Sequence, residues 1–249
     1  MKIVVIGGTG LIGTQVCKRL REGGHDVLSA SPRSGVNAVT GEGLQTALKG
    51  ADVVVDVANA PSFEDAAVLE FFEKSARNLA AAEKTAGVKH HVALSVVGTD
   101  RMLESGYFRA KMAQEEIIRK AGVPWSILRA TQFFEFIGAI AQSGARGDTI
   151  RLTSAALQPI ASVDVAAAMA NIAVAPPTGK IEEVAGPDKQ PLVSFATTYL
   201  QHTKDQRQVI TDDQAGYYGA IIDDQSLTPG ANPILGKIHF DQWLKSSSA

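Results

Sequence analysis

The amino-acid sequence predicts an α/β fold with a doubly wound parallel β-sheet, and two observations carry this prediction. Short segments rich in β-branched residues alternate with longer segments of helical periodicity along most of the chain. Most of the short segments are continuously apolar, which is typical of parallel strands that are buried on both faces. Such alternation joins successive strands into one parallel sheet through right-handed helical crossovers.

The predicted elements follow one another from the N-terminus to about residue 185. The strands are expected at Lys2–Ile6, Asp26–Ala30, Val53–Val57, His91–Ser95, Ser126–Arg129 and Lys180–Val184. The helices are expected around Ile12 to Leu20 with Gly23-Gly24 as the stop, from Glu64 to Thr85, from about Ser105 to Lys120, and after Asp164 as an N-cap. From about Gly186 the pattern loosens, so a small C-terminal lobe packed on the sheet is predicted there.

The composition argues against several classes of protein. The chain has 249 residues, with 24 Lys and Arg against 26 Asp and Glu, and a formal charge of −2. This balance argues against a nucleic-acid or membrane-surface partner that binds through bulk charge. The single cysteine, Cys17, excludes an intrachain disulfide and a cysteine-based zinc cluster. No apolar run is long enough for a membrane span, and a cytoplasmic location is predicted. The His90-His91 pair has no third ligand at suitable spacing, so no metal site is expected.

The glycine-rich segment after the first predicted strand is the strongest functional signal. It reads Gly7-Gly8-Thr9-Gly10-Leu11-Ile12-Gly13 and opens the first predicted helix. In this arrangement Gly7 permits a sharp turn, Gly10 lets the backbone approach a pyrophosphate, and Gly13 lets the helix pack closely on the strand. The phosphates would bind the free N–H groups at the helix N-terminus. We therefore expect residues 1–249 to form a single Rossmann-type NAD(P)-binding domain, in which residues 186–249 are a substrate-capping lobe that is not independent.

The segment after the second predicted strand favours NADP(H) over NAD(H). An NAD site usually has an acidic residue about 20 residues after the glycine loop, where it binds the ribose 2′-hydroxyl. Here that position is Arg33, between Ser31 and Ser34, and no carboxylate lies between Leu28 and Thr40. A guanidinium with flanking hydroxyls suits a 2′-phosphate, because it pairs with two phosphate oxygens at once. The alternative is that Arg33 is a solvated loop residue.

Three polar residues in the middle of the chain have the chemistry of a carbonyl reductase. Ser95 ends a predicted strand, at the edge where parallel sheets bind ligands, and Tyr107 and Lys111 share one helix face. A phenol exchanges protons near neutral pH only when a nearby cation stabilises its phenolate, and Lys111 could be that cation. Ser95 could polarise the substrate oxygen. The alternatives are a packing role for Tyr107, a turn-capping role for Ser95 and a solvated Lys111.

These motifs together resemble the short-chain dehydrogenase/reductase superfamily. The likeness rests on the glycine loop, on Ser95 followed by Val96-Val97-Gly98, and on Tyr107-x-x-x-Lys111. The segments Trp125-Ser126-Ile127-Leu128-Arg129-Ala130 and Asp164-Val165-Ala166 are similar to the atypical, NmrA-like NAD(P)H-binding group. The resemblance covers about residues 1–185.

The resemblance implies a role for each matching residue. Tyr107 would be the proton donor, Lys111 would hold the nicotinamide ribose, and Ser95 would complete the catalytic set. The other implied cofactor contacts are Thr9, Gly10, Leu11 and Ile12 at the phosphates, Arg33 at the adenosine phosphate, Ala58, Asn59 and Ala60 at the adenine-proximal ribose, and Ala130, Thr131 and Phe133 near the nicotinamide.

The functional hypothesis is an NADPH-dependent oxidoreductase that transfers a hydride to a small, largely apolar carbonyl or quinone. One alternative is a regulatory protein that senses NADP(H) without catalysis, because some members of the NmrA-like group lack the tyrosine. A second alternative is a nucleotide-sugar epimerase, for which the C-terminal segment is short. The expected partner is a small-molecule substrate, and a homo-oligomer is compatible with the sequence.

Overall fold

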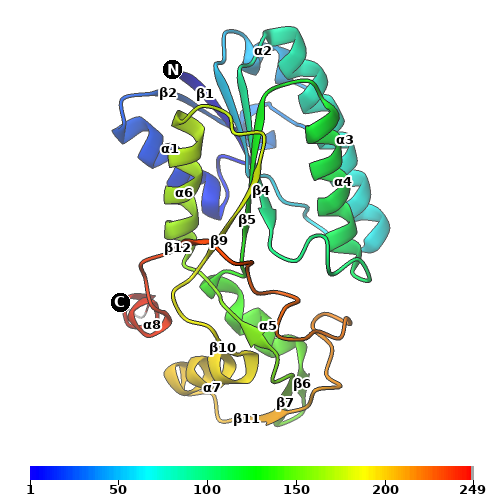
Figure 1. Ribbon diagram of the computed structural model, residues 1–249, viewed down its shortest axis with the longest axis vertical. Coiled ribbons are helices and arrows are strands. Elements are labelled where there is room, and N and C mark those ends of the chain that lie inside the picture. The colour runs from blue at the N-terminus through cyan, green and yellow to red at the C-terminus, as the bar shows by residue number, and fades with distance from the viewer. Residues whose placement is uncertain (248–249) are drawn as a thin grey trace. The chain divides into compact units, whose positions relative to one another are not determined.

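A seven-stranded sheet forms the centre of the computed structural model, which describes residues 1–247 (Figure 1). Its strands are β1 (Lys2–Ile6), β2 (Asp26–Ala30), β3 (Val53–Asp56), β4 (His90–Val96), β5 (Trp125–Ala130), β9 (Ile181–Ala185) and β12 (Ile234–Leu235). Every strand predicted from the sequence is present, with bounds within one residue of those expected. The short β12 was not predicted.

The strand order across the sheet is β12-β9-β5-β4-β3-β1-β2. Strand β1 pairs in parallel with β2 on one side and with β3 on the other, and β4 continues in parallel from β3. The chain therefore reverses its direction of winding at β1. In open parallel sheets this switch point leaves a crevice outside the carboxyl ends of the two flanking strands, where ligands bind. The predicted α/β fold with a doubly wound parallel sheet is confirmed.

Helices cover both faces of this sheet. Its helices are α1 (Leu11–Glu22), α2 (Leu44–Leu48), α3 (Asp65–Ala86), α4 (Gly106–Lys120) and α6 (Ser162–Val174). Figure 1 shows α1 and α6 on one face, with α3 and α4 on the other. The predicted helices are confirmed, and α1 ends at the expected glycine, Gly23. Each helix buries an apolar stripe, as in α1, where Ile12, Val16 and Leu20 lie one turn apart on the buried side.

The predicted N-cap at Asp164 is wrong. Helix α6 begins at Ser162, so Asp164 lies inside its first turn. The Asp164 carboxylate instead accepts hydrogen bonds from the backbone N–H groups of Lys237 (2.8 Å) and Ile238 (3.0 Å). An acidic side chain is favourable both as the N-cap and within the first turn of a helix. The sequence pattern therefore did not distinguish these two positions.

The chain between β2 and β3 contains no strand among the described residues. After a short 3₁₀ turn, η1 (Pro32–Ser34), the backbone runs irregularly to α2. The side chain of Asn78 in α3 holds this segment, because its amide donates to the carbonyl oxygens of Ala38 (2.9 Å) and Val39 (2.8 Å). Backbone carbonyls that would pair in a strand are thus satisfied by one side chain.

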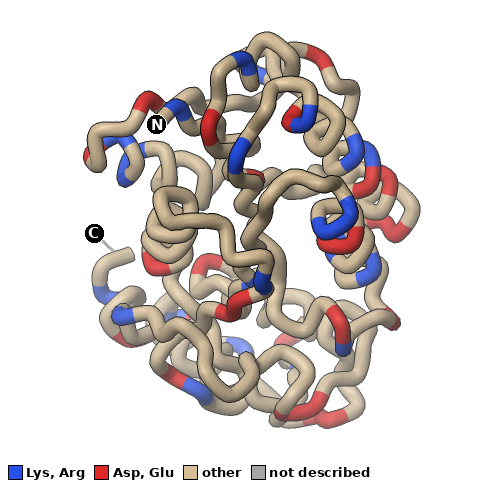
Figure 2. The backbone as a smooth tube through the Cα atoms, turned by 45° about the horizontal axis from the view of Figure 1, so that its top comes forward, with Lys and Arg blue, Asp and Glu red and all other residues tan. Residues whose placement is uncertain are grey.

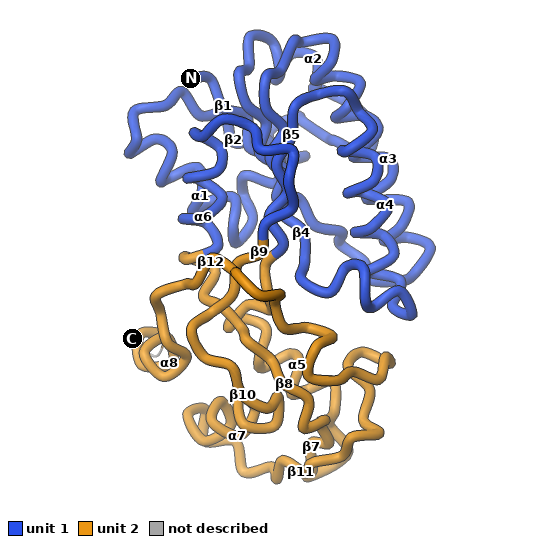
Figure 3. Tube along the Cα trace, in the orientation of Figure 1, with its two compact units in different colours: residues 1–129, 165–182 blue, residues 130–164, 183–249 orange. Residues whose placement is uncertain are grey.

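The chain divides into two compact units (Figure 3). Unit 1 consists of residues 1–129 and 165–182, and unit 2 consists of residues 130–164 and 183–249. The lobe expected over residues 186–249 lies in unit 2, which also includes the segment after β5. That the whole chain is one domain with a dependent lobe stays a prediction.

Unit 2 has short strands, three helices and an aromatic core. Its elements are η2 (Phe134–Phe136), α5 (Ile137–Ser143), β6 (Ala145–Arg146), β7 (Thr149–Leu152), β8 (Ala156–Leu157), β10 (Gln190–Pro191), α7 (Leu192–Thr203), β11 (Gln208–Thr211) and α8 (Phe240–Ser247). The ring of Phe240 lies 5.1 Å from that of Phe134, 5.3 Å from that of Phe195 and 5.9 Å from that of Trp243. Such aromatic contacts contribute to packing through both area and ring geometry.

Replacing Asn78 with Ala is expected to loosen the segment between η1 and α2. Two backbone carbonyls lose their donor, so the free energy of unfolding should fall by about 1 to 2 kcal/mol. Urea unfolding measures this loss, and hydrogen exchange should show faster exchange of amides within residues 36–43. Arg77→Ala, on the exposed side of α3, is the matched control. Unchanged exchange in this segment would contradict the assigned role of Asn78.

Candidate nucleotide-binding and catalytic site

The glycine loop of unit 1 is shaped by close backbone packing. Gly7 has a positive φ of +77°, and a Cβ there would lie 2.8 Å from the backbone of Ala58. A Cβ on Gly13 would overlap the carbonyl oxygen of Gly7, well inside van der Waals contact. These two glycines therefore allow β1, the loop after β3 and α1 to pack against one another, as the sequence pattern predicts.

Gly8 is also required, although the spacing rule did not single it out. A Cβ on Gly8 would lie 2.5 Å from the Ser29 hydroxyl oxygen and 2.9 Å from the Ser29 Cα atom. The loop therefore packs closely on β2 as well as on the chain after β3. The only sequence signal for this contact is that Gly8 directly follows Gly7.

Gly10 differs from the other glycines of the loop. It is exposed and is the N-cap of α1, with no side-chain cap, and its hypothetical Cβ would meet only the carbonyl oxygen of Gly7 at 3.3 Å. Packing within the protein therefore leaves room for a small side chain at position 10. A ligand that lies close to the backbone would not leave this room. Thr9 and Leu11 are exposed beside it, and Ile12 is buried. This open N-terminus of a twelve-residue helix fits the pyrophosphate of a dinucleotide.

The predicted 2′-phosphate residues lie together on η1, directly after β2. Ser34 closes this turn, because its hydroxyl accepts a hydrogen bond from the Ser31 N–H (2.9 Å) and donates to the Ser31 carbonyl (2.9 Å). Arg33 is exposed and makes no ion pair or hydrogen bond with the part of the chain that the structure describes. The arrangement therefore presents one unpaired guanidinium at the end of β2.

The segment expected at the adenine-proximal ribose lies beside the glycine loop. Ala58 abuts Gly7, and its N–H donates to the Asp56 carboxylate (3.1 Å). The Asn59 side-chain oxygen accepts a hydrogen bond from the N–H of Ala60 (3.1 Å). The structure thus brings together the glycine loop and residues 58–60 at the carboxyl ends of β1 and β3.

Ser95 belongs to a buried charged network. Its hydroxyl donates to the Glu115 carboxylate (2.6 Å), and Thr99 lies 3.4 Å away. Glu115 also accepts two hydrogen bonds from Arg129 (2.9 and 2.8 Å), and Arg129 forms a further ion pair with Asp100 (3.0 Å). Burial opposes the charge of Arg129, but Glu115 and Asp100 together raise its pKa. Ser95 is therefore held by an ionised pair within unit 1.

Tyr107 lies half-buried in an aromatic cluster. Its ring contacts those of Phe63 (5.6 Å), Phe72 (6.0 Å) and Phe108 (5.9 Å), and its hydroxyl donates to the Asn59 side chain at 3.5 Å. Burial raises the pKa of Tyr107 to about 12, so the phenol keeps its proton at neutral pH. The structure records no contact between the phenol and Lys111.

Lys111, one turn after Tyr107, points into the interior of unit 1. It is 3% exposed, and its ammonium donates to the carbonyl oxygen of Leu94 (2.9 Å) and to the side chain of Gln114. The same ammonium lies 4.3 Å from the centre of the Phe72 ring. Burial lowers the pKa of Lys111 to about 8, against the opposing effects of Asp56 and Glu115.

The residues expected near the nicotinamide begin at Ala130, the last residue of β5, and belong to unit 2. Ala130 and Thr131 are buried, and the ring of Phe133 stacks on that of Phe136 at 5.5 Å. The Thr131 hydroxyl and the side-chain oxygen of Gln132 are buried without a hydrogen-bond partner. Sequence reasoning did not include Gln132.

The two adjacent histidines of β4 point in different directions. The Nδ1 atom of His91 lies 2.6 Å from the Glu83 carboxylate, whereas the Nε2 atom of His90 lies 2.9 Å from the Ser126 hydroxyl. Burial, together with the charge of His91, lowers the pKa of His90 to about 4. Burial also disfavours protonated His91, but Glu83 outweighs it and raises the His91 pKa. Adjacent side chains of a strand alternate between faces, so the pair does not converge on one ion.

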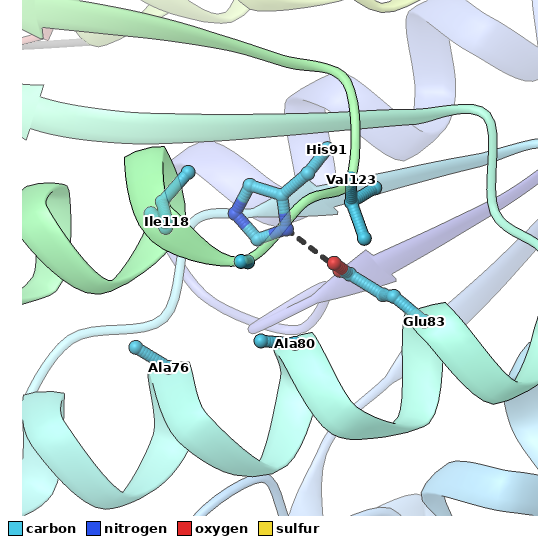
Figure 4. A pocket seen from close by; sticks show the side chains of 7 residues that line it. Ala76, Ala80, Glu83, His91, Ile118 and Val123 are labelled. Atoms are coloured by element: carbon cyan, nitrogen blue, oxygen red, sulfur yellow. Dashed lines mark hydrogen bonds and ion pairs between the residues drawn. The ribbon is translucent and has the colours of Figure 1, made fainter.

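A small pocket lies beside the His91–Glu83 pair, away from the glycine loop (Figure 4). Figure 4 shows the imidazole of His91 directed toward α3, where it forms a hydrogen bond with the Glu83 carboxylate. The pocket is lined by Ala76, Ala80, Glu83, His91, Ile118, Ala121 and Val123. Apart from the pair itself the lining is apolar, and no predicted site residue contributes to it.

Several residues of the site escaped sequence reasoning. Asp56, Gln114, Glu115 and Arg129 are all buried and hydrogen-bonded to predicted site residues or to one another. One signal was available: Asp56 and Arg129 are charged residues in or at the end of otherwise apolar strands, where an unpaired charge would be costly. Gln114 and Glu115 gave no comparable signal, because Gln and Glu are common on the exposed faces of surface helices.

Charge elsewhere is distributed evenly. Figure 2 shows positive and negative positions interspersed along the backbone. Among residues 1–247 there is no cluster of three or more His, Cys, Asp or Glu side chains that could hold a metal ion. Within the same range, none of the helices has the length and apolar character needed to cross a membrane.

The parallel sheet and the glycine loop are those of an NAD(P)-binding protein. Residues 7–176, more than half of the chain, match the family described as NAD(P)H-binding, and the protein belongs to this family.

One similar curated protein is a (4-alkanoyl-5-oxo-2,5-dihydrofuran-3-yl)methyl phosphate reductase from Streptomyces griseus. It is 32% identical over 144 residues, which are 53% of this chain and 48% of that protein. The chain spans about half the length of the curated relatives it matches.

Two solved structures show the same fold. A short-chain dehydrogenase/reductase superfamily protein from Agrobacterium tumefaciens, with bound NAD, has a TM-score of 0.74 and 17% identity, and the match covers 100% of this chain and 96% of that chain. An NADPH-dependent quinone oxidoreductase from Escherichia coli, in complex with NADPH, has a TM-score of 0.64 and 20% identity, with coverage of 84% and 77%.

Replacing Lys111 with Met is expected to change the pH dependence of unfolding. The pKa of Lys111 falls from 10.5 to about 8 on folding, so between these pH values the folded protein binds fewer protons than the unfolded chain. The free energy of unfolding of the wild type should therefore rise by roughly 3 kcal/mol across this interval, and the variant should lack the rise.

Urea unfolding at about pH 7.5, 9 and 10.5 measures this difference. Lys120→Met is the matched control, because Lys120 is exposed at the end of the same helix. If Lys111→Met and the wild type show the same pH dependence, Lys111 is not titrating in the interior.

Proposed function

We propose that the protein is an NADPH-dependent oxidoreductase that reduces a small, largely apolar carbonyl or quinone. The open N-terminus of α1 at Gly10 carries the proposal, because glycine there serves a ligand more than it serves the fold. Bound NADPH would supply the hydride. Residues of this chain would bind the nucleotide and donate the proton.

The preference for NADPH over NADH rests on the end of β2. The unpaired guanidinium of Arg33 supplies a positive charge where the adenosine 2′-phosphate is expected, and Ser31 and Ser34 flank it. A charge-assisted, two-point contact with phosphate is stronger than a contact with a hydroxyl.

Tyr107 is the proposed proton donor. Reduction of a carbonyl to an alcohol requires one proton at oxygen for each hydride at carbon, and a phenol carries such a proton at neutral pH. Burial raises the pKa of Tyr107 and so opposes loss of this proton, but the alkoxide that hydride transfer forms is basic enough to take it. The proton lost by Tyr107 is then replaced from solvent. Phe63, Phe72 and Phe108 surround the phenol, and this apolar setting favours an apolar acceptor.

Ser95 and Lys111 have supporting roles in this proposal. Lys111 binds the nicotinamide ribose with the N–H donor that is not used by Leu94 or Gln114. Ser95 exchanges its hydrogen bond with Glu115 for one to the substrate oxygen as negative charge develops there. In unit 2, Ala130, Thr131 and Phe133 are the proposed nicotinamide contacts, and residues 186–249 are the proposed capping lobe.

Purified protein mixed anaerobically with NADPH and a panel of ketones and quinones is expected to oxidise the NADPH. Tyr107→Phe should lower kcat for ketones by about 10²- to 10⁴-fold, because the donor of the proton is lost. The decay of the NADPH absorbance band is the measurement. Tyr218→Phe, at an exposed position of unit 2, is the matched control.

The outcomes separate the functions. Tight NADPH binding without oxidation of NADPH by any acceptor would contradict the enzyme and indicate a nucleotide-sensing protein. Full activity of Tyr107→Phe would remove Tyr107 as the donor while leaving the oxidoreductase in place. A nucleotide-sugar epimerase would retain its nucleotide through purification and consume no NADPH.

Replacing Arg33 with Asp is expected to reverse the cofactor preference. The variant loses the proposed partner of the 2′-phosphate and gains a carboxylate suited to a ribose hydroxyl, so Kd for NADPH should rise about 10- to 100-fold more than Kd for NADH. Fluorescence titration with both nucleotides measures the change. Arg119→Asp in α4 is the control, and equal losses for the two nucleotides would contradict the assignment of Arg33.

A further inference from the structure

Gln114 lies at the centre of a buried polar chain in unit 1. Its side chain is 2% exposed. Its oxygen accepts a hydrogen bond from the Lys111 ammonium, and its nitrogen donates to the Asp56 carboxylate at 2.9 Å. A neutral amide can accept from a cation and donate to an anion at the same time, which no carboxylate, ammonium or apolar group can do.

The chain continues from Asp56 to the glycine loop. Asp56 ends β3, is 2% exposed, and uses its second oxygen to accept a hydrogen bond from the Ala58 N–H at 3.1 Å. Ala58 in turn abuts Gly7, where a side chain would not fit. Lys111 and the glycine loop are thus linked through Gln114, Asp56 and the backbone of Ala58.

Gln114 also determines how many donors Lys111 has free. Of the three N–H donors of the ammonium, one goes to the Leu94 carbonyl and one to Gln114. Only the third N–H donor has no oxygen partner among the described residues. The ammonium also lies over the Phe72 ring. Two fixed hydrogen bonds therefore set the direction of the third.

We propose that Gln114 is a positioning residue for cofactor binding, which orients the ammonium of Lys111 and couples its charge to the carboxylate of Asp56. The inference rests on the proposed role of Lys111 at the nicotinamide ribose. Gln114 itself touches neither cofactor nor substrate in this proposal.

The charged groups around Lys111 make Asp56 the carboxylate to test. Asp56 faces it from β3 and Glu115 from α4, and both act to keep the ammonium charged. Glu115 is already paired with Arg129 through two hydrogen bonds, and Asp100 pairs with Arg129 from the other side. Among the described residues Asp56 makes no ion pair within direct contact, and its two oxygens accept hydrogen bonds from Gln114 and from the Ala58 N–H. Tyr107, one turn before Lys111, stays neutral around pH 8 because burial raises its pKa. The charge of Asp56 also helps to raise the pKa of His91.

The first experiment measures Kd for NADPH against pH. In the wild type Kd should rise as Lys111 loses its proton near pH 8. Gln114→Met should raise Kd at neutral pH about tenfold and move the midpoint about one unit lower, because Lys111 loses both an acceptor and its link to Asp56. Asp56→Asn keeps one oxygen acceptor for Gln114 but removes the charge and the acceptor of the Ala58 N–H, so its midpoint should fall. Gln114→Glu keeps an acceptor for Lys111 but sets a second carboxyl group against the Asp56 carboxylate, so the two carboxyls hold one proton between them at first. Loss of that proton adds negative charge beside Lys111 and should move the midpoint upward.

The second experiment titrates Lys111 in the protein without nucleotide. Heteronuclear NMR of the lysine ammonium groups, with Lys111→Met for assignment, follows the charge of Lys111 directly. Gln114→Met and Asp56→Asn should each lower its pKa. Gln201→Met, at an exposed position of α7, is the matched control and should leave the pKa unchanged.

The two experiments separate failure of the inference from failure of the proposed function. A Lys111 pKa that is the same in the wild type and in folded Gln114→Met overturns the inference, whether or not NADPH binds. Lowered pKa values in a protein that does not bind NADPH would support the coupling and contradict the cofactor. If Gln114→Met does not fold, Asp56→Asn and Gln114→Glu carry the test, and opposite shifts of the Lys111 pKa are required.

Discussion

The close approach of three backbone segments at the glycine loop is the constraint on which the site depends. Gly7 lies against Ala58, Gly8 against Ser29, and Gly13 against the carbonyl of Gly7. Side chains at these positions would separate β1 from the chain after β2 and β3 and from α1. Because the three contacts meet at the point where the sheet reverses its winding, the same packing that closes the fold also leaves the N-terminus of α1 open.

The second determinant is the way in which buried charge is compensated near the carboxyl ends of β3, β4 and β5. Glu115 and Arg129 neutralise each other and hold Ser95, whereas Lys111 and Asp56 are joined through a neutral amide. A charge that is paired directly in the interior keeps its charged form, while one that is stabilised only through a relay is easier to neutralise. Burial lowers the pKa of Lys111 because Asp56 and Glu115 offset it only in part, whereas two directly bonded carboxylates outweigh burial at Arg129 and raise its pKa.

Sequence reasoning was most reliable where local patterns and long-range packing require the same residues. The strands of the sheet are apolar because both faces are covered, so Val53–Asp56 and Trp125–Ala130 could be recognised without knowledge of their neighbours. Helix boundaries were less certain, and the cap at Asp164 was misplaced because an acidic residue in the first turn satisfies the same local rule. The place of Gln114 could not be found, because nothing in a helix pattern tells which polar residue faces a buried lysine.

The sequence by itself determined the apolar strands, the glycine loop between β1 and α1, and the common helix of Tyr107 and Lys111, since each depends on residues close together in the chain. Only the tertiary structure decided that the Asn78 side chain, and not a neighbouring strand, hydrogen-bonds the backbone carbonyls of residues 38 and 39. It also decided that the Ser95 hydroxyl donates to the Glu115 carboxylate. It also decided that the ammonium of Lys111 turns toward Gln114 rather than toward the phenol of Tyr107. The physical reason is that these interactions join residues of different elements, and the desolvation of buried charge, which depends on the whole fold, selects among the partners available to each group.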